Sequence, residues 1–375
     1  MWFVLIFFGI YSGMHAYLFW KVHQALPHMG KLALLLAAFF VLMIFGPFLV
    51  RLLDRAFHFR AAAALAAVAY SWIAILFWFC CLFVAADAWN VLIRLAALAW
   101  PAARHALLPP GVALASLGVM ILLAAGWAYF EAHRIGLRRV TISTAAIPRG
   151  EKPITIAMIS DMHLGDNSGR SRLRQVIEIV REARPDVLIS DGDILDSPRQ
   201  GLADAAQALE ALRPPLGKFA VFGNHEFYAG VDNSTAFIES AGFRLLRQDR
   251  AEVNGHLVIA GVDDPAGGPF GHDRTNEDAV LPEEENGKFR ILLKHRPDVR
   301  QQSLGRFDLQ LSGHTHGGQL FPFMAVVNMV FPYGPGLHEL AGGSQLYVSR
   351  GTGTWGPAMR LFAPPEVTII RLEAR

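Results

Sequence analysis

The sequence predicts an α/β domain over about residues 150–373, preceded by an all-α transmembrane domain over about residues 1–135. Two observations predict this division. Apolar and aromatic residues dominate the first third of the 375-residue chain, whereas nearly all Asp and Glu lie after position 150. After Arg149, short apolar stretches alternate with stretches of helical periodicity, which is typical of α/β domains. The length of the chain is sufficient for both domains.

Four stretches of the N-terminal domain are long and apolar enough to cross a bilayer, which requires about 20 residues. None contains Asp, Glu, Lys or Arg, so none could form the polar face of a water-exposed helix. The first lacks the charged start and the cleavage site of a signal peptide, and we interpret it as retained. The four predicted spans are Trp2 to Trp20, Leu32 to Val50, Ala61 to Ala86 and Leu107 to Phe130.

The segment from Asp87 to Arg104 is expected to form a helix that lies along the membrane surface. Its Arg94 stands among apolar and aromatic residues such as Trp89 and Trp100, a composition typical of interfacial helices. A fifth span is the alternative interpretation of this segment.

Four spans would place the N-terminus and the C-terminal domain on the same side of the membrane. Basic residues near that side outnumber those near the other side, which favours a cytoplasmic C-terminal domain. A fifth span would reverse this orientation. The residues compared are Arg51, Arg55, Arg60, Arg134, Arg138 and Arg139 on one side, and Lys21, Lys31, Arg94 and Arg104 on the other.

The charge balance and the cysteines exclude two kinds of partner. A formal net charge of +2 provides no basic footprint for nucleic acid, which is therefore not an expected partner. Cys80 and Cys81 are adjacent within an apolar stretch, so no disulfide partner is expected.

The C-terminal domain is expected to alternate short strands with helices. Helices are predicted at residues 173–183, 202–212 and 235–241. Strands are predicted at residues 154–159, 186–190, 219–222, 257–260, 290–293, 309–311, 345–348 and 367–371.

Polar motifs directly follow five of the predicted strands, at the edge where ligands gather in open α/β sheets. Their Asp, Asn and His side chains offer oxygen and nitrogen ligands that suit manganese, iron or zinc. Glycines flank these residues, as expected where the backbone bends sharply. The motifs are Ser160-Asp161-Met162-His163, Asp191-Gly192-Asp193-Ile194-Leu195-Asp196, Gly223-Asn224-His225-Glu226, Lys294-His295-Arg296-Pro297 and Gly313-His314-Thr315-His316-Gly317-Gly318-Gln319.

The ordered series D-x-H, G-D-x-x-D, G-N-H-E, a single His and G-H-x-H resembles the calcineurin-like metallophosphoesterase superfamily. The segments G-H-T-H-G-G-Q, Y-V-S-R-G-T-G and P-E-V look like the bacterial YkuE/YaeI-type branch. All five motifs in order are far more specific than any one of them. The resemblance covers about residues 150–373 and leaves out the helical domain, which is longer than the single anchor or signal associated with that branch. It implies a four-layer α/β/β/α sandwich and, with the predicted spans, a multi-pass protein of a bacterial inner membrane.

The resemblance also implies a centre of two divalent metal ions, with manganese as the first expectation and iron or zinc as alternatives. Two ions spaced about 3.5–4 Å apart need an anion between them, and Asp193 would be this bridging ligand. A hydroxide bridging the ions would attack phosphorus in line. One ion would be held by Asp161, His163 and His316, and the other by Asn224, His295 and His314.

Four further residues have roles implied by the same resemblance. His225 would stabilise the transition state or protonate the leaving oxygen, and Asp196 would orient it. Arg296 and Arg350 are candidates for binding the substrate phosphate, because a guanidinium offers a planar fork. Ion pairs are the alternative for both arginines, and Glu226 is expected to have a structural role or to support a metal ligand.

The run from Phe321 to Phe331 is unusually apolar for a segment that follows a metal-binding motif. Two interpretations remain open: it fills the core, or it forms a membrane-facing cap that admits an amphipathic substrate.

The expected function is that of a membrane-anchored phosphoesterase acting on a phosphodiester or pyrophosphate bond. Membrane attachment suggests a lipid-linked substrate, and the resemblance suggests UDP-2,3-diacylglucosamine, a nucleotide-linked lipid of lipid A synthesis. The alternative from another class is a non-enzymatic membrane sensor or transport protein whose phosphoesterase domain only binds a ligand. The complete set of motifs argues against a purely binding role, and the scarcity of charge in the spans argues against a transport pathway.

Overall fold

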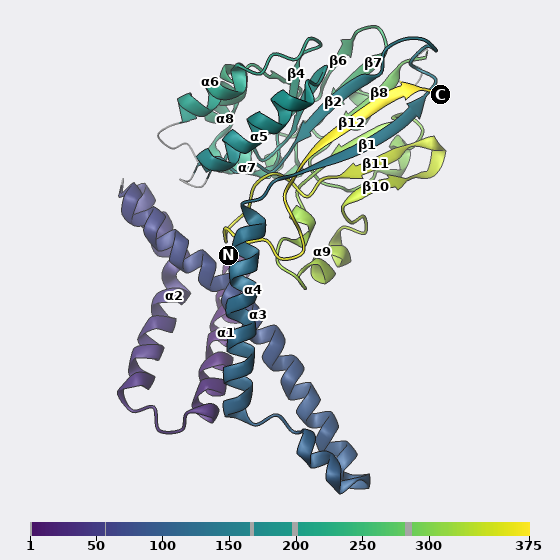
Figure 1. The fold of residues 1–375 in the computed structure, drawn as a ribbon. Helices are drawn as coiled ribbons and strands as arrows, with labels where there is room; N and C mark the ends of the chain where they lie inside the picture. The colour runs from purple at the N-terminus through teal and green to yellow at the C-terminus, as the bar shows by residue number, and fades with distance from the viewer. Residues whose placement is uncertain (1, 57, 166–168, 197–201, 282–286) are drawn as a thin grey trace. The chain divides into compact units, whose positions relative to one another are not determined.

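The computed structural model describes residues 2–56, 58–165, 169–196, 202–281 and 287–375 (Figure 1). The chain separates into two compact units. The N-terminal unit comprises residues 1–129 and 356–359, and the C-terminal unit comprises residues 130–355 and 360–375. Each unit is described by itself.

The N-terminal unit consists of long apolar helices. Among the described residues, three stretches are long and apolar enough to cross a membrane, at Lys31–Leu53, Arg60–Ala99 and Pro110–Ala132. They belong to α2, α3 and α4, and the further span expected near the N-terminus, in α1, stays a prediction. The helices are α1 Trp2–Ala25, α2 Lys31–Arg55, α3 Phe59–Ala99 and α4 Pro110–Ala132, with a short 3-10 helix at Pro101–Ala106 before α4.

The expected separate interfacial helix after Asp87 is wrong, because α3 continues through this segment to Ala99. Neither Gly nor Pro occurs between Phe59 and Ala99, so nothing in the sequence interrupts the helical hydrogen bonds. Pro101 ends the helix, since proline has no N–H to continue it.

The helices of this unit bury little of their apolar surface against one another. A small core includes Tyr11, Leu18 and Phe40, whereas Leu34 is 73% exposed and Leu122 is 69% exposed. Such exposure of large apolar side chains is costly in water and favourable in lipid.

The C-terminal unit is built on two mixed six-stranded sheets (Figure 1). One sheet has the order β1-β12-β2-β3-β4-β5, and the other has the order β10-β11-β9-β8-β7-β6. The first contains β1 Gly136–Thr144, β12 Glu366–Ala374, β2 Ile154–Ile159, β3 Val187–Asp191, β4 Lys218–Val221 and β5 Arg244–Leu245. The second contains β10 Gly336–Glu339, β11 Gln345–Val348, β9 Leu309–Ser312, β8 Phe289–Leu293, β7 Leu257–Gly261 and β6 Asp249–Val253.

The alternation of side chains along each strand determines how the sheets pack. In β2, Ile156 and Met158 belong to the cluster shared by the two sheets, whereas Ala157 and Ile159 belong to the cluster on the opposite face. Successive side chains of a strand point to opposite faces, so an apolar strand such as β2 is covered on both sides. The helices α5 Gly169–Ala183, α6 Leu202–Glu210 and α8 Val231–Ser240 supply much of the cover of the first sheet. The predicted α/β sandwich is therefore confirmed.

Strands β2, β3, β4 and β5 run parallel to one another, as do β7, β8, β9 and β11. All eight strands predicted from the sequence are present, with small shifts at their ends. The carboxyl ends of β2, β3 and β4 therefore meet at one edge, and those of β8 and β9 meet at one edge of the second sheet. These are the strands that precede the five polar motifs.

Strand β1 was not expected from the sequence. It pairs in parallel with β12, from Gly136 opposite Glu366 to Thr144 opposite Ala374. Most of its side chains are exposed because it is an edge strand, so it lacks the apolar pattern of a buried one. Its residues lie between the predicted domains of residues 1–135 and 150–373, whose bounds stay a prediction.

Candidate metal centre

The backbone bends sharply at the candidate ligands. Asp161, His163, Asp193, His314 and His316 all have positive φ angles, between 49° and 66°. This left-handed conformation is uncommon for residues other than glycine, and costs about 1–3 kcal/mol at each position. Its concentration in the motifs that follow β2, β3 and β9 indicates a site whose geometry is imposed by the surrounding fold.

Two glycines allow these turns to approach one another. Gly192 has a φ of 87°, and a Cβ there would lie 2.6 Å from the Gly223 nitrogen and 2.8 Å from His295 Nδ1. Gly351 has a φ of 74°, and a Cβ there would lie 2.7 Å from the Asp161 Cβ. A larger residue at either position would force the candidate ligands apart.

The first group of candidate ligands comprises Asp161, His163 and His316, whose ligand atoms lie within 4.8 Å of one another. His163 Nε2 is 3.0 Å from His316 Nε2, and His316 Nε2 is 3.5 Å from Asp161 Oδ1. All three residues are buried. Asp161 is fixed by the Ser160 hydroxyl, which donates to its Oδ2 at 2.6 Å, and by the His314 N–H, which donates to its Oδ1 at 3.0 Å.

The second group comprises Asp193, His295 and His314, and its ligand atoms also lie within 4.8 Å of one another. His295 Nδ1 is 2.7 Å from the Asp191 carbonyl oxygen, and His295 Nε2 is 3.1 Å from Asp193 Oδ2. A hydrogen bond from Nδ1 to a carbonyl leaves Nε2 as the coordinating atom, an arrangement common at metal sites. Asn224 Oδ1 is buried and has no hydrogen-bond partner within the described part of the chain.

Asp193 joins the two groups. Its Oδ2 lies 3.1 Å from His295 Nε2 of one group and 3.9 Å from His163 Nε2 of the other. Its Oδ1 accepts a hydrogen bond from the His225 N–H at 2.8 Å. The carboxylate of Asp193 therefore lies between the two groups, and its role as a bridging ligand stays a prediction.

Asp196 contacts two histidine rings with one oxygen. Its Oδ1 is 2.7 Å from His163 Nδ1 and 2.7 Å from His225 Nδ1. A carboxylate in this position orients both imidazoles, so the Nε2 atom of each is the one left for a metal or a substrate.

The electrostatics follow from the burial of many titratable groups. Burial, and after it the charge of His295, lower the pKa of His314 to about 3, so this imidazole is neutral, the form that binds metals. Burial opposes protonation of His225, but the hydrogen bond to Asp196 and the charges of Asp193 and Asp196 raise its pKa to about 9. Two bound cations would lower this pKa toward neutrality, because like charge disfavours the imidazolium.

The donors suit divalent cations on chemical grounds. Carboxylate, amide and imidazole atoms converge here from the ends of strands in both sheets, and Asn224 Oδ1 is a buried acceptor that still requires a partner. Buried polar atoms without partners are costly, and a mixed oxygen and nitrogen set accepts Mn, Fe or Zn. The residues fit a pair of metal ions.

Comparison with known proteins decides the family. A sequence model of the calcineurin-like phosphoesterases matches residues 154–318. An uncharacterized metallophosphoesterase of Aquifex aeolicus is 42% identical over 260 residues, which cover 68% of this chain and 98% of that protein. The chain belongs to the calcineurin-like phosphoesterases. It is accordingly a metallophosphoesterase, a metal-dependent hydrolase of phosphoric esters.

Two other relatives of this metallophosphoesterase differ in length from it. The uncharacterized metallophosphoesterase YkuE of Bacillus subtilis is 32% identical over 260 residues, which cover 66% of this chain and 88% of that protein. A protein of Danio rerio named as a transmembrane protein with a metallophosphoesterase domain is 33% identical over 247 residues, which cover 62% of this chain and 56% of that protein.

Arg296 and Arg350, the predicted phosphate-binding residues of the metallophosphoesterase, each lie beside a carboxylate. Arg296 donates to Asp264 through Nε at 2.7 Å and through Nη2 at 2.8 Å. Arg350 donates to Glu366 Oε2 at 2.6 Å. Both guanidinium groups are partly exposed, at 30% and 33% of the side chain, so N–H groups remain available at each. Their role in substrate binding stays a prediction.

Two buried charged residues support the site through hydrogen bonds to the backbone. Glu226 accepts four hydrogen bonds, from the backbone N–H groups of Gly223, Asp193, Ile194 and Leu195. Arg360 donates to the carbonyl oxygens of Gly353, His316 and Ala363. The G-N-H-E motif contained a signal for Glu226, but Arg360 follows no motif and only the fold reveals its contacts.

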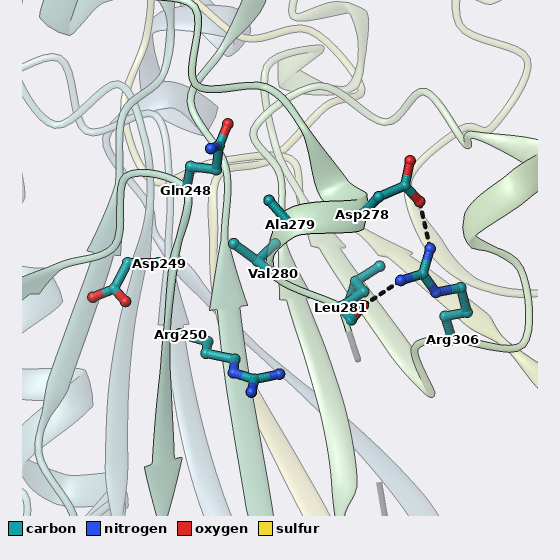
Figure 2. A pocket seen from close by; sticks show the side chains of 8 residues that line it. All are labelled: Gln248, Asp249, Arg250, Asp278, Ala279, Val280, Leu281 and Arg306. Carbon is teal, nitrogen blue, oxygen red and sulfur yellow. Dashed lines mark hydrogen bonds and ion pairs between the residues drawn. The ribbon is translucent and has the colours of Figure 1, made fainter. Parts of the chain in front are cut away.

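A hollow of about 580 Å³ lies elsewhere, at β6 and the segment before β8 (Figure 2). None of the candidate ligands lines it. Arg306 contacts Asp278 and the Leu281 carbonyl oxygen at its wall (Figure 2). This hollow has no part in the candidate metal centre.

Proposed function

We propose that this protein is a membrane-anchored dinuclear metallophosphoesterase that hydrolyses a phosphodiester or pyrophosphate bond of a lipid-linked substrate. The observation that carries the proposal is the convergence of two ligand groups on Asp193, which is a member of one group and lies 3.9 Å from His163 of the other. A single cation would not require a shared carboxylate between two such groups.

In this proposal Asp161, His163 and His316 hold one cation. Asn224, His295 and His314 hold the other, and Asp193 contacts both. Two divalent cations held by these residues would supply Lewis-acid polarisation of phosphoryl oxygens and activation of water. Manganese is the first candidate, with iron and zinc as alternatives, because the donor set accepts all three.

The histidine beside the ligands has a role of its own. His225 Nδ1 is held by Asp196, so Nε2 is the nitrogen that can give a proton to the leaving oxygen. Its ring contacts the rings of Tyr228 and Trp355, with centroids 5.4 Å and 6.1 Å away. These aromatic neighbours limit the access of water, and Arg296 and Arg350 would orient the substrate phosphate.

Several features support a lipid-linked substrate. Three stretches in α2, α3 and α4 are long and apolar enough to cross a membrane, and the Danio rerio relative is named a transmembrane protein. The similarity to YkuE supports membership of the YkuE/YaeI-type branch. On this basis UDP-2,3-diacylglucosamine is the specific substrate to test, and the distribution of arginine favours catalysis on the cytoplasmic side.

The test uses the detergent-solubilised full-length protein with added Mn²⁺. We would measure bound metal and the hydrolysis of UDP-2,3-diacylglucosamine and of a chromogenic phosphodiester. Asp193→Ala and His225→Ala are the test variants, and His256→Ala is the matched control, because His256 pairs with Glu151 away from the candidate ligands.

Turnover of the UDP-lipid that is lost in both test variants and kept in the control would establish the specific substrate. Turnover of the chromogenic diester alone would support the proposed hydrolysis but would exclude UDP-2,3-diacylglucosamine as the substrate. Binding of fewer than two metal ions per chain by an active wild-type protein would overturn the dinuclear proposal.

A further inference from the structure

The segment after the G-H-T-H motif forms an exposed apolar surface, which we call the apolar platform. Its helix α9, Met324–Val330, is labelled in Figure 1. None of the residues of this helix is buried. Met329 is 85% exposed and Val330 is 69% exposed. The expectation that this run fills the core is therefore wrong, and exposed apolar surface of this kind marks an interaction site. The platform comprises Phe321, Phe323, Val326, Met329, Val330 and Phe362.

The platform carries no ionisable carboxylate, amine or guanidinium. No Asp, Glu, Lys or Arg occurs between Asp308 and Glu339. A surface that docks a soluble protein is usually bounded by polar residues that fix the register of the partner. A long uncharged stretch with several aromatic residues suits a lipid surface better.

Two segments that are distant in sequence form this platform together. The ring of Phe321 lies 5.6 Å from that of Phe362, and Leu320 pairs with Leu361 in a parallel bridge. The Gln319 side chain donates to the Trp355 carbonyl oxygen and accepts from its N–H. These contacts hold the apolar side chains as one surface.

The platform is tied to the end of α4. The Glu131 carboxylate, in the last turn of α4, accepts hydrogen bonds from the Phe362 N–H at 3.3 Å and from the Ala363 N–H at 2.8 Å. Three residues, 133 to 135, connect α4 to β1, and about 3.5 Å per residue is the longest reach of a chain. Glu131, in the last turn of a helix long and apolar enough to cross a membrane, therefore lies directly beside Phe362.

Basic residues lie close by in the sequence. Arg134, Arg138 and Arg139 follow α4 directly, and all three are exposed. Exposed arginines next to a membrane-spanning helix attract the phosphates of anionic lipids. The level of the lipid headgroups is thus marked by the end of α4 and by these arginines.

The platform also adjoins the candidate metal centre. The ring of Phe331, which follows α9 directly, packs edge-on against His314 at 5.3 Å between centroids. A phosphate held at the metal centre would therefore lie close to the platform.

We propose that the apolar platform inserts into the bilayer that α4 spans, with its side chains among the acyl chains and the metal centre at the headgroup level. A phosphoester lipid would then reach the metals without leaving the membrane. The insertion itself does not depend on the proposed chemistry, whereas its consequence for substrate supply rests on the proposed function.

The test measures the environment of single labelled cysteines. The full-length protein, with Cys80→Ala and Cys81→Ala, would be placed in vesicles of phosphatidylethanolamine and phosphatidylglycerol. An environment-sensitive fluorophore would be attached at Met329→Cys or Val326→Cys on α9. Arg213→Cys is the control, because this exposed residue precedes β4 and lies at the edge of the sheet opposite the metal centre.

Lipids brominated in their acyl chains would then be added as quenchers. We expect both α9 labels to lose at least half of their fluorescence, because an interfacial helix buries its apolar face about 5–10 Å deep. The label at residue 213 should stay unquenched. Equal quenching at all three positions, or at none, would overturn the proposal.

A further arm separates this proposal from the enzymatic one. Asp193→Ala labelled at residue 329 should keep its quenching, because Asp193 takes no part in the platform. If the label at residue 329 were not quenched in a chain that keeps Asp193, only the insertion would be overturned. If that chain showed quenching but did not hydrolyse phosphoesters, the result would count only against the proposed chemistry.

Discussion

The Glu226 carboxylate accepts a hydrogen bond from the backbone N–H of Asp193 at 2.9 Å. This contact links the motif after β4 to the motif after β3, and the same carboxylate also accepts from Ile194 and Leu195. Burial raises the pKa of Glu226 to about 6, and the charge of Asp193 contributes to the same shift. The loop that carries Asp193 is thus fixed by hydrogen bonds from its backbone to a second buried acid, Glu226.

Replacement of Glu226 by glutamine should loosen this loop. A glutamine places an NH₂ group against backbone donors, so at least one buried N–H loses its acceptor at a cost of about 1–3 kcal/mol. We expect a lower midpoint of thermal unfolding and weaker metal binding. Glu239→Gln, at an exposed position on α8, is the matched control and should change neither quantity. An unchanged midpoint for Glu226→Gln would show that the four hydrogen bonds contribute little.

Asp196→Asn should lower activity without removing a metal ligand. Asp196 orients both His163 and His225, and loss of such a partner costs about 10–100-fold in metal affinity or activity. The double variant with His225→Ala should lose less activity than the product of the single losses, because the two side chains act together. Steady-state hydrolysis of a chromogenic diester would measure this, and fully multiplicative losses would contradict the proposed coupling.

Lys218 should make stability depend on pH in the alkaline range. Burial lowers its pKa to about 8, while its Nζ donates to the carbonyl oxygens of Leu209 and Ala241. Between pH 8 and the ordinary pKa of about 10.4, the unfolded chain holds the proton that the folded chain has released. The free energy of unfolding contributed by this group therefore rises with pH across that range.

The measurement compares thermal unfolding of the wild type and Lys218→Met from pH 7 to pH 10. The difference between the unfolding midpoints of the two proteins should be constant below pH 8. Above pH 8, the midpoint of the wild type should rise relative to that of Lys218→Met. Parallel curves over the whole range would show that the lysine titrates normally.

Metal removal should destabilise the C-terminal unit. A ligand that binds only the folded state adds about 2.7 kcal/mol of stability at 100 times its dissociation constant. We expect added Mn²⁺ to raise the unfolding midpoint and a chelator to reverse this, with both effects abolished in Asp193→Ala. A Mn²⁺-dependent rise that persists in Asp193→Ala would place the metal elsewhere.

Much of the fold of this protein could be predicted from local patterns in the sequence. Charge-free apolar runs predicted the long helices α2, α3 and α4 because a bilayer admits only chain whose polar groups are satisfied internally. Alternating apolar residues predicted strands such as β2 and β8 because each is covered on both faces. The motifs that contain the candidate ligands were recognisable because each lies within a few residues of a strand end. Edge strand β1 escaped notice because few of its residues need to be apolar.

The sequence by itself determined the class of most segments, the resemblance to the family and the candidate ligands of the metal centre, since these depend on residues close together in the chain. Only the tertiary structure decided which distant groups meet. It brings Arg360 to the His316 carbonyl oxygen, Glu366 to Arg350 and Phe362 to Glu131. It also leaves α9 exposed rather than buried. The physical reason is that burial and pairing depend on which strands become neighbours, and no short stretch of sequence specifies that order.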